Sequence, residues 1–412
     1  MTDVSPLAPA GFPDLPPIAG LRLATHAAGI RYAARADLFL AEMAEGTTVA
    51  GTFTKSLCPS APVDWCRRIL AEGDGTARAV VCNSGNANAF TGKAGETAAA
   101  LTAELIAGEL GVDPVRVYLA STGVIGETLP EEALRSGLPA LADSLDNANA
   151  ETWSDAAGAI RTTDTFSKAA STRIPGTAAH IVGIAKGSGM IAPDMATMLG
   201  FVFTDLGVAP DVLQVALSAS VATSFNRITV DSDTSTSDTV LLFATGEQID
   251  DEISSTDDER FVDFQTALDD VLLDLAHQIV RDGEGATKFV EVAVSGAATD
   301  EAAEIIAFAI GNSPLVKTAL AAEDANWGRI VMAVGKAGQA ADRDNLSIWI
   351  GPEQVAEHGV QFHDYSEDRA TAHLQEDEVK IAVDVGVGTG AASIWTCDLT
   401  HGYIDINAGY RS

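Results

Sequence analysis

Several residues with chemical potential meet in the middle of the 412-residue sequence, in the segment KGSGMIAPDMATMLGFVFTD from Lys186 to Asp205. A lysine followed by glycine comes first, a Pro-Asp turn follows, and Ala196 and Thr197 then precede an apolar run. A threonine hydroxyl is a weak nucleophile unless a neighbouring base takes its proton. Thr197, at the mouth of an expected buried strand, therefore needs a base before it can do chemistry.

The sequence offers no serine-hydrolase arrangement as that base, because G-x-S-x-G is absent and no histidine lies near the candidate hydroxyls. A threonine at a chain N-terminus carries its own base, since an α-amino group has an unperturbed pKa of about 7.7 to 8.0. If the Thr197 hydroxyl attacked the Ala196 carbonyl within a strained turn, scission would create such a terminus. The alternative is that Thr197 is an ordinary β-branched strand residue.

Three glycine-bearing loops could place polar groups around such a nucleophile: residues 121–123, 186–189 and 282–288. None has the order of a P-loop or the spacing of a dinucleotide-binding loop, so a phosphate cradle is not indicated. Each loop is equally consistent with a tight turn that needs a positive φ.

The composition excludes several classes of function. The 25 Lys and Arg residues stand against 58 Asp and Glu, and a net charge of −33 repels nucleic acids and anionic membrane surfaces. The proline-rich first twenty residues do not resemble a signal peptide, and no run of 18 apolar residues occurs, so we expect a cytoplasmic protein without membrane spans. Four cysteines without a CxxC pair and seven scattered histidines predict reduced thiols and no metal site.

The elements that must position the candidate residues alternate between strand and helix patterns, with 47% hydrophobic and 20% charged residues. We expect strands over 77–82, 116–120, 239–244 and 289–294, with a turn after residue 82, and helices over 96–110, 211–225 and 257–281. The mixed pattern continues over 313–321, 346–350, 380–385 and 391–399. This alternation predicts layered sheets with helices outside, in the α/β or α+β class. No linker occurs near residue 190, so the middle of the chain should lie inside the fold.

Residues 186–201, KGSGMIAPDMATMLGF, resemble the cleavage segment of the ornithine acetyltransferase family, the bifunctional glutamate N-acetyltransferase/amino-acid acetyltransferases. Further blocks extend the likeness over nearly the whole chain: AGTFTKS, CNSGNANAFTG, ASTGVIGE, RTTDTFSK, FNRITVDSDTSTSD, DGEGATKF, EDANWGRI and INAGYRS. The resemblance implies an α/β (α+β) layered sandwich with two stacked β-sheets flanked by helices, self-cleaving and similar to the N-terminal nucleophile hydrolases.

The resemblance also implies a reaction. The precursor would cut itself between Ala196 and Thr197 into an alpha chain, 1–196, and a beta chain, 197–412, interlaced in one fold. Thr197 would take acetyl from N2-acetyl-L-ornithine and pass it to L-glutamate in a ping-pong cycle of arginine biosynthesis. A heterotetramer of two alpha and two beta chains without metal or organic cofactor is implied, whereas use of acetyl-coenzyme A as a further acetyl donor is left open.

Individual roles follow from the matching positions. Thr122 and Gly123 match the family's oxyanion-hole pair, and Lys186 matches its substrate-contacting lysine, suited to a carboxylate. The other matching substrate contacts are Thr162, with Thr163 as its alternative, Glu284, Asn407 and Ser412. Asn83, Asn86, Asn88 and Asp231 lie in family blocks without an assigned step.

Two other functions would use the same residues. A self-processed aminopeptidase or amidohydrolase of the same fold would let water replace glutamate as acceptor, although such enzymes usually present serine at the cut. A non-catalytic small-molecule binding protein would use the glycine loops as an anion cradle, and it predicts an intact 412-residue chain.

Overall fold

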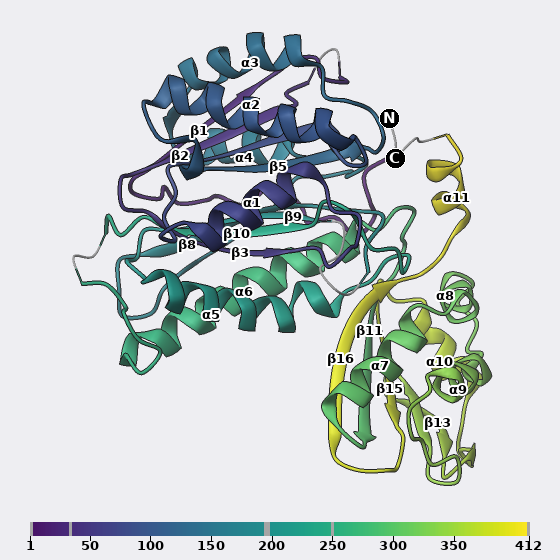
Figure 1. The fold of residues 1–412 in the computed structure, drawn as a ribbon. Coiled ribbons are helices and arrows are strands. Elements are labelled where there is room, and N and C mark those ends of the chain that lie inside the picture. Colours follow the sequence, from purple (N-terminus) through teal and green to yellow (C-terminus); the bar gives the residue numbers. More distant parts are fainter. Residues whose placement is uncertain (1–2, 33–34, 193–197, 249–250, 410–412) are drawn as a thin grey trace.

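Three β-sheets and their helices form the molecule in the computed structural model, which describes residues 3–32, 35–192, 198–248 and 251–409. Two five-stranded sheets are stacked face to face, and the third, six-stranded sheet lies beside them (Figure 1). The stacked pair with outer helices confirms the expected layered α/β sandwich. The third sheet was not anticipated from the sequence.

The first sheet has the strand order β5-β4-β2-β1-β6, in which β4 and β5 are parallel and the other neighbours antiparallel. Its strands are β1 (Leu21–His26), β2 (Leu38–Met43), β4 (Ala79–Asn86), β5 (Val117–Val124) and β6 (Asp146–Asn147).

The second sheet has the order β3-β10-β9-β8-β7, in which only β9 and β10 are parallel. Its strands are β3 (Thr48–Phe53), β7 (Lys168–Arg173), β8 (His180–Lys186), β9 (Leu199–Thr204) and β10 (Thr239–Ala244). The middle of the chain thus lies inside this sheet, as expected.

The third sheet has the order β14-β13-β12-β15-β11-β16, with β11 and β15 parallel. Its strands are β11 (Phe289–Ala297), β12 (Ser347–Ile350), β13 (Glu353–Glu357), β14 (Val360–Gln361), β15 (Glu378–Asp384) and β16 (Gly390–Cys397). After β16 the chain returns toward the stacked sheets (Figure 1).

Helices cover the outer faces of the stacked sheets, α2 and α3 on the first and α5 and α6 on the second (Figure 1). The α-helices are α1 (Ala61–Glu72), α2 (Gly92–Leu110), α3 (Glu131–Asp143), α4 (Ala150–Ala159), α5 (Pro210–Thr223), α6 (Glu259–Arg281), α7 (Asp300–Gly311), α8 (Pro314–Ala321), α9 (Trp327–Lys336), α10 (Glu367–Leu374) and α11 (His401–Asn407). Short 3₁₀ turns occur at η1 (Pro114–Arg116) and η2 (Phe225–Arg227). Within the described ranges, every helix is too short or too polar to cross a membrane.

The core between the stacked sheets follows from strand periodicity. Successive side chains of β9 point to opposite faces, so Phe201 and Phe203 face the first sheet while Val202 faces α5 and α6. The Phe201 ring lies 5.5 Å from that of Phe39 in β2, and the Phe203 ring lies 5.7 Å from that of Trp153 in α4. These contacts join the two sheets into one layered body.

The elements with strong apolar periodicity lie where the sequence predicted them, whereas a strand that ends in polar residues is longer than predicted. Strand β10 coincides with the predicted 239–244, and α6 covers most of the predicted 257–281. Strand β4, however, continues through the expected turn to Asn86, and all eight of its residues are buried. Hydrogen bonds make this burial tolerable, because Asn83 donates to the Asn86 carbonyl and the Ser121 hydroxyl donates to the Asn83 side chain.

Candidate functional site

A cavity of about 400 Å³ lies where β5 and β8 end and the loop before β10 begins. Its lining brings together six predicted site residues from distant parts of the chain: Thr122, Gly123, Thr162, Lys186, Glu284 and Asn407. Thr163, the alternative to Thr162, lines it as well. The predicted residues Ala196, Thr197 and Ser412 lie outside the described residues.

Thr122 and Gly123 stand at the carboxyl end of β5, beside its parallel neighbour β4. Gly123 has φ of +130°, and a Cβ there would lie 2.3 Å from the carbonyl carbon of Gly85, so only glycine fits. The pairing of β4 and β5 shifts register at the same point. Such a bulge re-aims the backbone beside a site. The local distortion thus places Thr122 and Gly123 at the cavity instead of continuing a regular ladder.

Lys186 ends β8 and is paired with Leu199 of β9, which begins two residues after Thr197. Its side chain lines the cavity, yet the residue is only 3% exposed. Burial lowers the pKa of the Lys186 ammonium, and the carboxyl groups of Asp164 and Asp238 oppose that effect. A bound carboxylate would stabilise the charged form further, so this ammonium suits an anionic ligand.

A buried ion network fixes the loops that carry these groups. Lys168 lies between Asp164 and Asp282, 2.7 and 2.5 Å from their carboxylate oxygens, with both the lysine and its partners shielded from solvent. Asp164 also accepts backbone N–H groups from Thr162 at 2.9 Å and Gly187 at 2.7 Å. Although burial favours the neutral acid, the Lys168 ammonium holds the pKa of Asp164 below its usual value. The network therefore ties three cavity loops into one unit.

Glu284 provides the carboxyl group of the cavity. Its Oε2 accepts a hydrogen bond of 2.6 Å from the Asn407 amide, and its backbone N–H donates to Ser188 at 2.8 Å. A Cβ on Gly189 would lie 2.4 Å from the Glu284 carboxyl, so the absence of a side chain there lets the two loops close. Burial raises the pKa of Glu284, and the Asn407 hydrogen bond opposes the rise. This carboxyl group is suited to a ligand ammonium.

Helix α11, near the carboxyl end of the chain, completes the wall of the cavity with Tyr403 and Asn407. The Tyr403 hydroxyl donates to Asp231 at 3.2 Å, and the Thr400 hydroxyl donates to the Gly285 carbonyl at 2.6 Å. Gly285 has φ of +75°, and a Cβ there would lie 2.5 Å from the Tyr403 nitrogen. The helix thus packs directly on the loop that carries Glu284.

Several residues that line the cavity have no role assigned from the sequence. The segment before β10 adds a hydroxyl-rich wall, formed by Ser235, Thr236 and Ser237, and the carboxylates of Asp231 and Asp233. The serine and threonine run in FNRITVDSDTSTSD was the available signal, but runs of this kind are common in surface loops. Asn83 does not line the cavity, and its side-chain oxygen accepts a hydrogen bond from the Ser121 hydroxyl.

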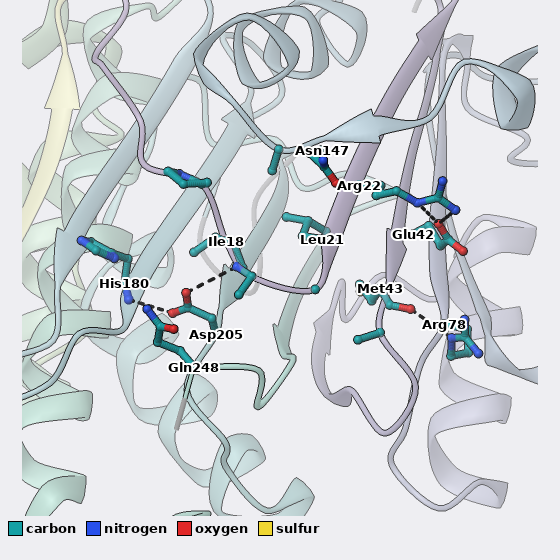
Figure 2. Close-up of a pocket in the computed structure, with 15 residues that line it drawn as sticks. Ile18, Leu21, Arg22, Glu42, Met43, Arg78, Asn147, His180, Asp205 and Gln248 are labelled. Atoms are coloured by element: carbon teal, nitrogen blue, oxygen red, sulfur yellow. Dashed lines mark hydrogen bonds and ion pairs between the residues drawn. The ribbon is translucent and has the colours of Figure 1, made fainter. Parts of the chain in front are cut away.

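A second cavity, of about 620 Å³, lies at the other end of β8 and β9 (Figure 2). Its charged groups have protein partners: Arg22 pairs with Glu42, and Asp205 accepts backbone N–H groups from His180 and Ala19. The predicted site residues that the structure describes do not line it. Apolar side chains such as Ile18, Leu21 and Met43 contribute much of its wall (Figure 2).

The smaller cavity has the chemistry expected of a site for a small amino acid. An ammonium, a carboxyl group and a backbone turn with a threonine hydroxyl converge on one space, which could hold a carboxylate, an amine and an acyl oxygen. Among the residues that the structure describes, His, Cys, Asp and Glu do not gather in groups of three that could bind a metal ion.

Comparison with known proteins identifies related sequences over the full chain. Residues 22–412 match the sequence profile of the ArgJ family. The arginine biosynthesis bifunctional protein ArgJ of Agrobacterium fabrum is 55% identical over 99% of both chains, and that of Gluconobacter oxydans is 54% identical over 99% of this chain and 96% of its own. A solved ArgJ structure from Bacillus halodurans is 45% identical with a TM-score of 0.49, covering 51% of this chain and 98% of that one.

Proposed function

The chain belongs to the ArgJ family, and from that premise we propose that it moves an acetyl group from N2-acetyl-L-ornithine to L-glutamate through an acetyl-Thr197 intermediate. The family assignment makes it an acetyltransferase of arginine biosynthesis. The donor, the acceptor, the intermediate and the self-cleavage that exposes Thr197 are the proposal.

The first half-reaction forms a threonine ester. The free α-amino group of Thr197 takes the hydroxyl proton as the oxygen attacks the acetyl carbonyl of acetylornithine. Negative charge develops on the carbonyl oxygen, where the Thr122 hydroxyl and the Gly123 N–H would donate. Collapse of this intermediate breaks the carbon–nitrogen bond, and the leaving amine takes the proton from the Thr197 α-ammonium. Ornithine then departs.

The second half-reaction runs the same steps in reverse with glutamate. The glutamate amine attacks the acetyl ester, the oxyanion forms in the same place, and the Thr197 oxygen leaves and regains a proton. Lys186 would neutralise the carboxylate of either substrate, and Glu284 with Asn407 would hold the side-chain ammonium of acetylornithine in the first half-reaction. Thr162 would supply a further polar contact.

One observation carries the proposal. Six matching residues, spread from Thr122 to Asn407, line one cavity, and β8 pairs Lys186 with Leu199, two residues after Thr197. A chance set of polar residues over such a span would not be expected to converge. The cavity also contains the ammonium and carboxyl groups that a zwitterionic amino acid requires.

We extend the proposal to processing and assembly. Self-cleavage would yield pieces 1–196 and 197–412, and two copies of each would form a heterotetramer in the cytoplasm, working without metal or organic cofactor. The named relatives are called bifunctional. The same site would accordingly also accept acetyl from acetyl-coenzyme A, with glutamate as acceptor.

The test compares the wild-type chain with Thr197→Ala. We expect denaturing electrophoresis and intact mass to give two fragments for the wild type and one uncut chain for the variant. The wild type should transfer acetyl from acetylornithine to glutamate, and the variant should lose at least about 10³-fold of this rate. An uncut, active wild type would refute the proposal. Hydrolysis of acetylornithine or peptide amides without transfer to glutamate would assign the chain to the hydrolase alternative.

A further inference from the structure

Asp238 is a buried residue whose carboxyl group contacts Met198, the residue after Thr197. It precedes β10, follows the cavity-lining Ser237, and has no exposed surface. Its Oδ1 accepts the Met198 N–H at 3.0 Å, and its backbone carbonyl accepts the Thr54 N–H at 3.0 Å. The backbone of Asp238 is therefore anchored to the residue that follows β3, and its carboxyl group holds the residue after Thr197.

This hydrogen bond supplies what the sheet lacks at that position. The parallel pairing of β9 with β10 begins with Leu199 opposite Thr239, one residue after Met198. The Met198 carbonyl accepts the Thr239 N–H at 3.2 Å, so consecutive residues 238 and 239 hold both backbone groups of Met198. Without the Asp238 oxygen, the buried Met198 N–H would lose this acceptor.

We propose that Asp238 is a positioning residue for the nucleophile, holding the peptide group between Thr197 and Met198 in one orientation. The inference rests on the proposed function, because it takes Thr197 as the attacking residue. The peptide group is planar, so a bond to the Met198 N–H also fixes the plane of the Thr197 carbonyl. A fixed plane limits the directions in which the Thr197 hydroxyl and amine can point. It should act on the rate of attack more than on substrate affinity.

The surroundings of Asp238 suggest a conservative substitution. Burial raises the pKa of Asp238 well above its usual value, and the Met198 N–H and then the Lys186 ammonium oppose the rise. A neutral carboxyl group offers one acceptor oxygen and one donor, and the amide of asparagine offers the same two kinds of group. Asp238→Asn thus keeps the acceptor for Met198, whereas Asp238→Ala removes it.

The experiment follows two rates in the full chain. Conversion to two fragments is timed by denaturing electrophoresis and intact mass, and kcat and KM for acetyl transfer from acetylornithine to glutamate are measured on matured protein. We expect Asp238→Ala to slow both cleavage and kcat by about tenfold, with KM within about twofold of wild type. Asp238→Asn should stay within about threefold of wild type in both rates. If the alanine variant does not fold, Asp238→Ser replaces it, because the shorter hydroxyl side chain cannot span the same gap.

Asp205 provides a matched control for the loss of a buried carboxyl group. It is 2% exposed, accepts backbone N–H groups from His180 and Ala19, and lies at the far end of the same strands. Asp205→Ala should lower the melting temperature at least as much as Asp238→Ala and leave cleavage and kcat within about twofold of wild type.

Three results would overturn the role of Asp238: an alanine variant with wild-type cleavage and kcat, equal slowing by Asp205→Ala, or an asparagine variant as slow as the alanine variant. These outcomes are distinct from a failure of the proposed function. That failure would appear as an uncut wild type or a cut Thr197→Ala chain, whatever the Asp238 variants do.

Discussion

The two cavities at opposite ends of β8 differ in chemistry more than in size. They are separated by the seven residues from His180 to Lys186, which span roughly 20 Å in an extended strand. The larger one, about 620 Å³, is lined by charged groups with protein partners, such as Arg22, which pairs with Glu42. The smaller one, about 400 Å³, holds the ionisable groups Lys186 and Glu284, whose pKa values burial shifts. Ionisable groups whose pKa values are shifted by burial, more than volume, thus distinguish the candidate site.

The same contrast appears in the backbone around the two cavities. The smaller cavity depends on close approaches that only glycine permits, at Gly123 against Gly85 and at Gly189 against the Glu284 carboxyl. The buried ion network of Lys168, Asp164 and Asp282 stabilises the loops around this cavity. At the larger cavity the Arg22 side chain is 47% exposed, and the buried Asp205 carboxylate accepts two backbone N–H groups. Substitutions that compare the two ends test whether this difference reflects function.

The largest difference should appear in stability. Lys168→Met leaves Asp164 and Asp282 as buried carboxylates without their shared cation, and we expect the free energy of unfolding to fall by about 3–5 kcal/mol. Arg22→Met removes the ion pair with Glu42 at the larger cavity, in which the arginine is about half exposed, and should cost less than about 1 kcal/mol. Urea unfolding of both variants measures the two losses. Equal losses would mean that the buried network contributes no more to the free energy of unfolding than the Arg22–Glu42 pair does.

The next difference should appear in turnover. Thr122→Val keeps the shape of the side chain but removes the hydroxyl donor, so kcat for acetyl transfer should fall by about 10²- to 10³-fold. Asn147→Ala, at the larger cavity, should leave kcat within about twofold of wild type. Steady-state kinetics at saturating substrate measures kcat of both variants and of the wild type. A wild-type kcat for Thr122→Val would remove this residue from the oxyanion site.

The smallest difference should appear in affinity and its pH dependence. Glu284→Gln should raise KM for acetylornithine about tenfold, because a carboxylate that holds an ammonium is replaced by a neutral amide. Burial raises the pKa of Glu284, so on acidification this carboxylate should take up a proton at a pH above the usual glutamate pKa of about 4.3. The wild-type KM should therefore rise as the pH falls toward that range. The KM of Glu284→Gln should lack this rise. Glu42→Gln should keep the wild-type profile, and a shared profile for all three proteins would contradict the assignment.

The sequence predicted the fold where periodicity was strong. Apolar spacing located α6, which presents one apolar face to the core, and a continuous apolar run located β10, which is buried on both faces of its sheet. The predicted end of β4, at residue 82, was wrong. Asn83 and Asn86 are residue types common in turns, and their hydrogen bonds in the sheet cannot be read from the sequence. Strand patterns were seen in the third sheet, but periodicity indicates only that a side chain is buried. It does not say which of three cores receives it.

The site was predictable only as far as motifs reached. Thr122, Lys186 and Glu284 stand in matching blocks, and the structure places all three on one cavity. The pairing of Lys168 with Asp282 was not predicted, because the two are 114 positions apart and neither looks unusual in its own segment. Asp238 escaped notice for the same reason: its contact with Met198 depends on how β9 and β10 align.

The strand order of the second sheet has a consequence for the lifetime of the molecule. Strands β9 and β10 follow residue 197, and they lie between β3 on one side and β8 and β7 on the other, all three of which precede it. After scission before residue 197, neither part could leave without breaking the β3–β10 and β8–β9 ladders together. The two parts would unfold in a single event, and a cell would have to degrade them as one particle.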